Sequence, residues 1–205
     1  AATTLGLTGD ERAVKPLIHM VERVLRFGPG NLVQHQAIVQ GLVALGRIRD
    51  ERAAGLLIKM LKKGYKYSVS DWQLQVRQAA ALGLGLLDQP TGNETLIDTL
   101  TDDEPVELLE SVTTALGMLR SEHSFRMMAG DLRFAPFENE NKLFRRQQGL
   151  IIALGQRGDR AAVPYLLPLV TSVYAEVRIA LTETLVKLGE TEQGEALIPL
   201  LRNRS

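Results

Sequence analysis

Aromatic and basic side chains gather in a few segments of this sequence. Eight of the ten aromatic residues lie in or beside segments that connect expected helices, chiefly 27–31, 64–70 and 133–141. Aromatic rings and arginines carry much of the binding energy of protein–protein interfaces. This placement predicts a partner-binding edge, which we define by Tyr65, Lys66, Tyr67, Trp72, Arg133, Phe134, Phe137 and Arg146.

Two other interpretations of this edge stay open. An inserted loop can tuck its own aromatic side chains against the nearest helix end, which needs no partner. A basic and aromatic surface can also stack on single-stranded nucleic acid. Asp71, Glu138 and Glu140 are interleaved with the edge residues, so we expect a protein partner of acidic character and not a nucleic acid.

The residue pattern does not indicate catalysis. His19, His35 and His123 lie in three different expected helices, and no two of them share a helical turn. A zinc site needs its ligands brought together at defined spacing, which these histidines lack. The sequence also has no phosphate-binding loop of Walker type and no serine in a nucleophile-elbow context. We therefore expect no catalytic residue, no metal site, no cofactor and no enzymatic activity.

Composition limits the chain further. Its 205 residues hold 24 Lys and Arg, 24 Asp and Glu, and no Cys, which excludes disulfides and thiolate metal sites. A hydrophobic content of 45% with 23% charged residues is typical of a soluble folded protein. No apolar run approaches the roughly 18 residues of a membrane span, and no leader is seen, so a cytoplasmic location is expected.

Charge is distributed unevenly along the chain. Residues 1–90 carry a balance of +5, and residues 91–205 carry −5. The acidic excess is concentrated in Glu94, Asp98, Asp102, Asp103, Glu104, Glu107 and Glu110. A solvated helix face explains such a cluster best, and a docking patch for a basic partner or for the basic half of a second copy is the alternative.

Internal repeats predict the fold. The phrase DERAVKPLI at 10–18 returns as DERAAGLLI at 50–58 and, more weakly, as DRAAVPYLL at 159–167. A second phrase ends at Gly6, Gly46, Gly85, Gly117, Gly155 and Gly189, with gaps of 32 to 40 residues. A period of this length without strand-like alternation indicates stacked helix pairs. The repeated glycine suits either a left-handed helix end or a close approach between helices.

Apolar spacing of three and four residues gives the helix ranges. We expect first helices near 10–26, 50–63, 92–101, 121–132 and 159–171, and second helices near 33–46, 71–87, 105–119, 142–156 and 174–189. Asp10, Asp50 and Asp159 are expected N-caps, and Pro16 and Pro164 are expected to bend their helices. The repeats then run near 10–46, 50–87, 92–119, 121–156 and 159–189 in one array covering 1–205. Partial repeats at both ends suggest additional repeats or a larger complex.

The phrases GDERAV at 9–14 and VRQAAALGLG at 76–85 resemble HEAT repeats. They are most similar to the short bacterial subtype that also occurs in phycobilisome lyases. The resemblance covers the whole chain, although the 92–119 unit lacks the opening phrase and the 121–156 unit carries an insert. It implies an all-α, right-handed α-solenoid of about five helix pairs.

Together, the repeats and the edge predict a non-enzymatic protein–protein interaction or scaffold module. It would bind through the aromatic and basic edge or through the concave face, which second helices line in such solenoids. The resemblance also implies an alternative, an accessory subunit of a phycobilin lyase or a related chromophore-handling system.

Overall fold

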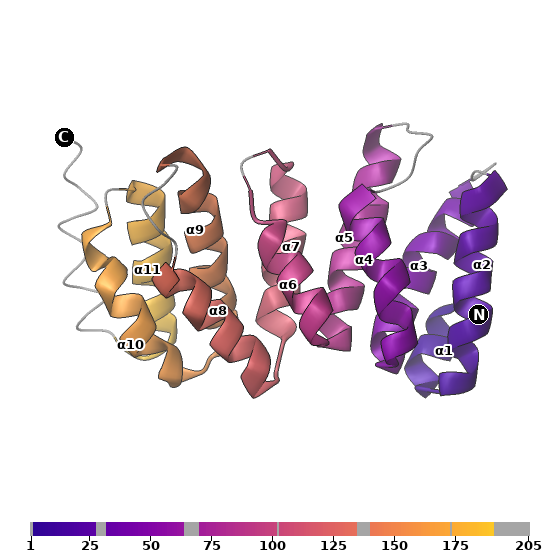
Figure 1. Ribbon diagram of the computed structural model, residues 1–205, viewed down its shortest axis with the longest axis horizontal. Coiled ribbons are helices and arrows are strands. Elements are labelled where there is room, and N and C mark those ends of the chain that lie inside the picture. The colour runs from indigo at the N-terminus through magenta and orange to yellow at the C-terminus, as the bar shows by residue number, and fades with distance from the viewer. Residues whose placement is uncertain are drawn as a thin grey trace.

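The computed structural model describes residues 2–27, 32–63, 70–101, 103–134, 140–172 and 174–190. These residues form helices and turns and contain no strand, which confirms the expected all-α class. The helices follow one another in chain order along the long axis of the molecule (Figure 1). No helix in this described part of the chain is both long enough and apolar enough to cross a bilayer.

The helices divide into two sets that we call the A layer and the B layer. The A layer comprises η1 (Glu11–Ala13), α2 (Val14–Phe27), η2 (Glu51–Ala53), α4 (Ala54–Lys63), α6 (Pro90–Asp98), α8 (Glu122–Phe134), η3 (Arg160–Ala162), α10 (Val163–Leu166) and η4 (Leu167–Thr171). The B layer comprises α1 (Ala2–Thr8), α3 (Leu32–Ile48), α5 (Ser70–Leu87), α7 (Val106–Met118), α9 (Glu140–Arg157) and α11 (Ala175–Lys187).

Each helix of the B layer packs on the next helix of the same layer. The contacts run from α1 to α3, α5, α7, α9 and α11 without a break, while α4, α6, α8 and α10 follow one another in the A layer. One hydrophobic cluster lies between the layers and extends from Ala13 to Leu188. Burying a leucine side chain in such a cluster stabilises the fold by about 1.5–3 kcal/mol, so packing between neighbours holds the helices in sequence.

Three aspartates begin the repeated A-layer segments, as expected. Asp10, Asp50 and Asp159 each accept a hydrogen bond from the backbone N–H two residues later, at the start of η1, η2 and η3. The hydrogen bond from the Arg52 guanidinium is the main reason that the pKa of Asp50 falls to about 2. These caps supply acceptors for donors that a helix start leaves unpaired.

The prolines behave differently from the expectation that they bend a helix. The aspartate caps a 3-10 turn, and the α-helix begins only after it, at Val14 and at Val163. Pro16 and Pro164 therefore lie in the first turn of α2 and of α10. A first-turn position lacks an intrahelical N–H partner, so a proline costs no hydrogen bond there.

Close approach between B-layer helices explains most of the repeated glycines. A Cβ atom on Gly46 would lie 2.2 Å from the Gly83 carbonyl oxygen, and one on Gly85 would lie 2.6 Å from that of Ala115. Gly189 differs, because its φ of 84° is that of a left-handed helix end. Both explanations considered from sequence therefore occur, at different glycines.

Candidate functional site

The predicted edge lies partly outside the described residues. Tyr65, Lys66, Tyr67 and Phe137 fall there, and Arg133 and Phe134 are described only as the last residues of the α8 backbone. Trp72 in the first turn of α5 and Arg146 in α9 can be placed. The edge as a whole stays a prediction.

Trp72 packs against a histidine of the neighbouring B-layer helix. Its ring lies 4.4 Å from the ring of His35, centroid to centroid, with 34° between the planes. His35 is 6% exposed, and its Nε2 has no hydrogen-bond partner among the described residues. Burial lowers the pKa of His35, because an apolar site disfavours the charged imidazolium. Trp72 is thus half-buried and held by a neutral ring.

Arg146 binds to the A layer. Its guanidinium forms two hydrogen bonds with Asp131 of α8, Nε–Oδ2 at 2.5 Å and Nη2–Oδ1 at 2.7 Å. Asp98 of α6 lies 3.6 Å away. The hydrogen bond with Asp131 is the main reason that the pKa of Arg146 is raised. Arg146 therefore ties α9 to α6 and α8.

A groove lies between α7 and α9 and has a volume of about 460 Å³. Apolar parts of Leu100, Leu109, Gly149 and Ile152 line it together with polar groups of Glu110, Thr113, Thr114, Arg145, Gln148 and Gln156. An apolar floor with a few polar groups is the usual composition of a protein's binding site. These two helices therefore carry the candidate site.

The residue that covers the repeated glycine changes at the groove. Gly6, Gly46 and Gly85 face residues that lie two positions before the next repeated glycine: Ala44, Gly83 and Ala115. Gly155 faces Thr184, five positions before Gly189. By the rule of the first three glycines, Gly117 should face Ala153, but it faces Gln156. The Gln156 side chain therefore lies over Gly117 and lines the groove.

Gly149 contributes to the floor of the groove. A Cβ atom there would lie 3.0 Å from Leu100 Cδ1 and 3.2 Å from Thr113 Oγ1. A glycine therefore lets these two side chains sit close against α9. The signal in the sequence was a glycine six positions before Gly155 with no counterpart at the same place in the other repeats. Leu100, Leu109 and Ile152 were not predicted as site residues from the sequence.

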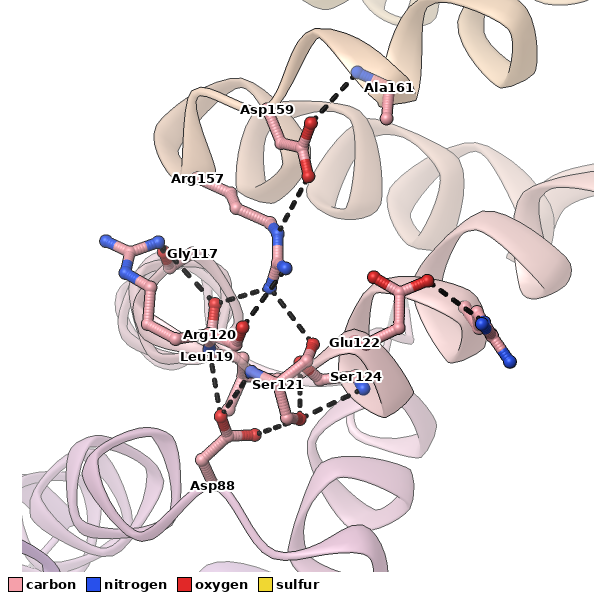
Figure 2. Close-up of polar contacts among 11 residues, drawn as sticks. Asp88, Gly117, Leu119, Arg120, Ser121, Glu122, Ser124, Arg157, Asp159 and Ala161 are labelled. Carbon is pink, nitrogen blue, oxygen red and sulfur yellow. Dashed lines mark hydrogen bonds and ion pairs between the residues drawn. The ribbon is translucent and has the colours of Figure 1, made fainter.

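A second polar cluster joins the turns between successive repeats (Figure 2). Asp88 accepts hydrogen bonds from the backbone N–H groups of Arg120 and Ser121, both at 2.8 Å. Arg157 donates to the carbonyl oxygens of Leu119 at 2.8 Å and Arg120 at 3.2 Å. Its guanidinium also lies 5.4 Å from the Phe125 ring centroid.

Opposing effects act on the Asp88 carboxylate. Burial raises its pKa, and the hydrogen bonds from Arg120, Ser121 and Asn93 lower it by more, so the net shift is downward. An ionised carboxylate with so many donors holds its turn firmly and has no lone pair directed at an open site. We assign this cluster to structure.

Among the described residues, no three His, Asp or Glu side chains lie together as metal ligands would. His19 and His123 are exposed and lie in α2 and α8. The acidic segment of the sequence also divides in space. Glu104 forms a two-point ion pair with Arg77 of α5, with N–O distances of 2.5 and 2.6 Å, whereas Glu110 lines the groove.

No protein-family model matches this chain. No curated protein is significantly similar to it.

Proposed function

We propose that this protein is a HEAT-type α-solenoid acting as a non-enzymatic protein-interaction module, with the groove between α7 and α9 as its docking site. The groove is the observation that carries the proposal. Its apolar floor suits one or two inserted side chains, and its rim offers the hydroxyl of Thr114 and the amides of Gln148 and Gln156.

The polar groups of the rim match those of a peptide chain. A glutamine amide both donates and accepts, as a peptide group does. The Thr114 hydroxyl donates to the Glu110 carbonyl oxygen at 2.9 Å and can still accept a hydrogen bond. A partner segment lying along α7 and α9 can therefore exchange its hydrogen bonds with water for hydrogen bonds with the rim. Docking of a partner segment in a groove between helices is a common mode of recognition.

The predicted aromatic and basic edge is a second docking surface in this proposal. Trp72 supports it in one respect, because a ring already held by His35 loses little freedom when a partner binds. The groove and the edge are served by different residues, so substitutions can separate them.

A pull-down from the source lysate tests the proposal with three variants of the full chain. Ile152→Trp fills the groove, and the Tyr65/Trp72/Phe137 triple alanine variant removes the edge. The third variant, a His19/Lys59/Arg126 triple alanine substitution, alters exposed residues of the A layer and is the matched control. Circular dichroism and thermal melting first establish that each variant folds.

A protein retained by wild type and by the control, but lost with Ile152→Trp, is the expected result. Loss with the edge variant alone would move the docking site to the edge. Equal retention by all four proteins would contradict both surfaces. The chromophore-handling alternative has a separate test, since a shifted absorption band on adding a free bilin would favour it over a purely protein-binding module.

A further inference from the structure

Equivalent positions on the B-layer helices form a continuous surface. Gly83, Ala115 and Thr184 each meet the preceding B-layer helix, so positions counted from them point in the same direction. The positions eight residues before Gly83, Ala115 and Thr184 are occupied by Gln75, Glu107 and Glu176, respectively. The positions one residue before them are occupied by Leu82, Thr114 and Glu183. The surface is uncharged at these positions of α5 and acidic on α7 and α11.

Four exposed carboxylates therefore flank α9: Glu107 and Glu110 on α7, and Glu176 and Glu183 on α11. Within the described part of the chain, none of the four takes part in an ion pair. Glu104 and Asp131 of this half behave differently, since each forms an ion pair with an arginine, whereas Glu94 of α6 is exposed on the A layer. Four carboxylates without an ion pair therefore lie on the two helices that flank α9.

The cations near the groove do not neutralise this surface. Arg145 lines the groove, and its guanidinium lies 4.9 Å from the centroid of the Phe144 ring. Arg146 is directed to the A layer and Arg157 to the turn at 119–121. Lys187 lies on α11, three residues after Thr184. Among the described side chains of this surface there are four carboxylates and two cations, Arg145 and Lys187, so these groups together carry a net negative charge.

We propose that the groove takes a partner segment that combines lysine or arginine side chains with a bulky aliphatic side chain. This inference rests on the proposed docking function. The aliphatic side chain inserts between Leu109 and Ile152, where its apolar surface is removed from contact with water. A cation beside it in the segment reaches Glu110 on the groove wall, and further cations reach Glu107 or Glu183. Complementary charge raises the association rate and excludes acidic segments.

Selection of random 12-residue peptides displayed on phage, with the immobilised full chain as target, provides the test. Enriched peptides are synthesised with a fluorescent label, and their affinity is measured by fluorescence anisotropy at low and high salt. The Glu107→Lys/Glu110→Lys variant reverses two carboxylates of the surface. Glu22→Lys/Glu51→Lys changes net charge by the same amount at exposed A-layer positions and is the matched control.

Peptides that carry Lys or Arg with an aliphatic residue are expected to be enriched. Their affinity should fall about tenfold with the Glu107/Glu110 variant and little with the control, as reversing two rim charges predicts. It should also fall with salt, because rim charges are screened. Enrichment of acidic or uncharged peptides, or equal binding to both variants, would overturn the partner chemistry and leave the docking function standing. No enrichment on the wild-type protein would overturn both.

Discussion

The pairing of His35 with Trp72 places a titratable ring where its charged form is unfavourable. The imidazole is 6% exposed and stacks at 4.4 Å on the indole ring. No described residue accepts a hydrogen bond from its Nε2. The contact joins α3 to α5 at the start of α5, beside the predicted edge, so protonating this histidine would weaken packing there.

Acidification is therefore expected to destabilise the protein through His35. Burial lowers the pKa of His35 from its ordinary value of 6.5, so the folded state binds fewer protons than the unfolded state. The stability that this group contributes is complete above pH 6.5 and decreases as the pH falls below it. Free energies of unfolding in urea at pH 7.5 and 5.5 measure the loss.

The His35→Phe variant provides the comparison. Phenylalanine keeps an aromatic ring against Trp72 and cannot be protonated, so its stability should change less between the two pH values. Titration of carboxylates contributes equally to both proteins. Equal losses of stability in wild type and variant would show that folding does not lower the pKa of His35.

Residue-scale detail of this kind was only partly predictable from the sequence. The sequence placed His35 and Trp72 in different expected helices, and no pattern indicated that they touch. Their contact depends on how α5 is aligned along α3, which the packing of Gly46 against Gly83 sets. Likewise, charge and residue type alone could not place Arg146 among A-layer acids, because its neighbours Asp98 and Asp131 belong to two other helices.

At the scale of the helices, glycines set the distance between B-layer neighbours. The Gly46→Ala substitution should destabilise the protein by about 1–3 kcal/mol or more, because its Cβ would meet the Gly83 backbone and force α3 and α5 apart. Urea denaturation followed by circular dichroism measures the change.

Gly130→Ala is the matched control for this substitution. Gly130 lies inside α8, and a Cβ atom there would have no described neighbour within 4 Å. Alanine should stabilise that helix by about 0.5–1 kcal/mol, because it restricts the unfolded chain more than glycine does. Opposite signs for the two substitutions are expected, and an unchanged or higher stability with Gly46→Ala would contradict the close-approach explanation.

Turns between repeats are joined by side chains from the following repeat (Figure 2). Arg157→Ala removes the donors to the carbonyls of Leu119, Arg120 and Ser121. The Arg157 side chain is 9% exposed, and hydrogen bonds from a charged group contribute about 1.5–3 kcal/mol, so we expect a loss of that size. Thermal and urea denaturation provide the measurement.

Arg126→Ala serves as the control for Arg157→Ala. Arg126 forms an ion pair with Glu122 within α8, at 3.0 Å, and its side chain is 77% exposed. Exposed pairs of this type contribute about 0.3–0.5 kcal/mol. An equal decrease in the free energy of unfolding for the two alanine variants would show that the Arg157 hydrogen bonds do not stabilise the turn.

Helix ranges were largely predictable, because apolar spacing and capping residues are local signals. The expected second helix at 71–87 corresponds to α5 at Ser70–Leu87, and the three aspartate caps are where the sequence placed them. The 3-10 turns after the caps were not predicted, because DERA at 10–13 and 50–53 and DRAA at 159–162 could equally form the first turn of an α-helix. That turn decides the position of Pro16 and Pro164.

At the scale of the whole molecule, the repeat period predicted neighbours but not their exact register. Regular repeats would have faced Gly117 with Ala153, and the sequence spacing of 38 residues between Gly117 and Gly155 is ordinary for this chain. The contact of the Gln156 side chain with Gly117 is a tertiary feature that the spacing does not indicate. For this reason, the groove could not be predicted from the sequence.

The B-layer helices contact mainly the preceding and following helices of their layer. Local stability is therefore expected to differ along the array. Each B-layer helix contacts the helices before and after it, so the free energy of the array is a sum of local and neighbour terms. The Gly155→Leu substitution disturbs the interface of α9 with α11, where a Cβ atom already lies 2.9 Å from Thr184. Gly85→Leu disturbs the interface of α5 with α7 in the middle of the array.

Hydrogen exchange measured by mass spectrometry distinguishes the two substitutions. With Gly155→Leu, amides of α11 and η4 should lose protection while those of α3 and α5 keep it, because the interfaces N-terminal to α9 are intact. With Gly85→Leu, α5 and α7 should both lose protection, and the loss should extend into each half, since neither half is then supported by the other. Uniform loss of protection in both variants would contradict the nearest-neighbour array and with it the solenoid proposal, because a single cooperative core would have to break as a whole.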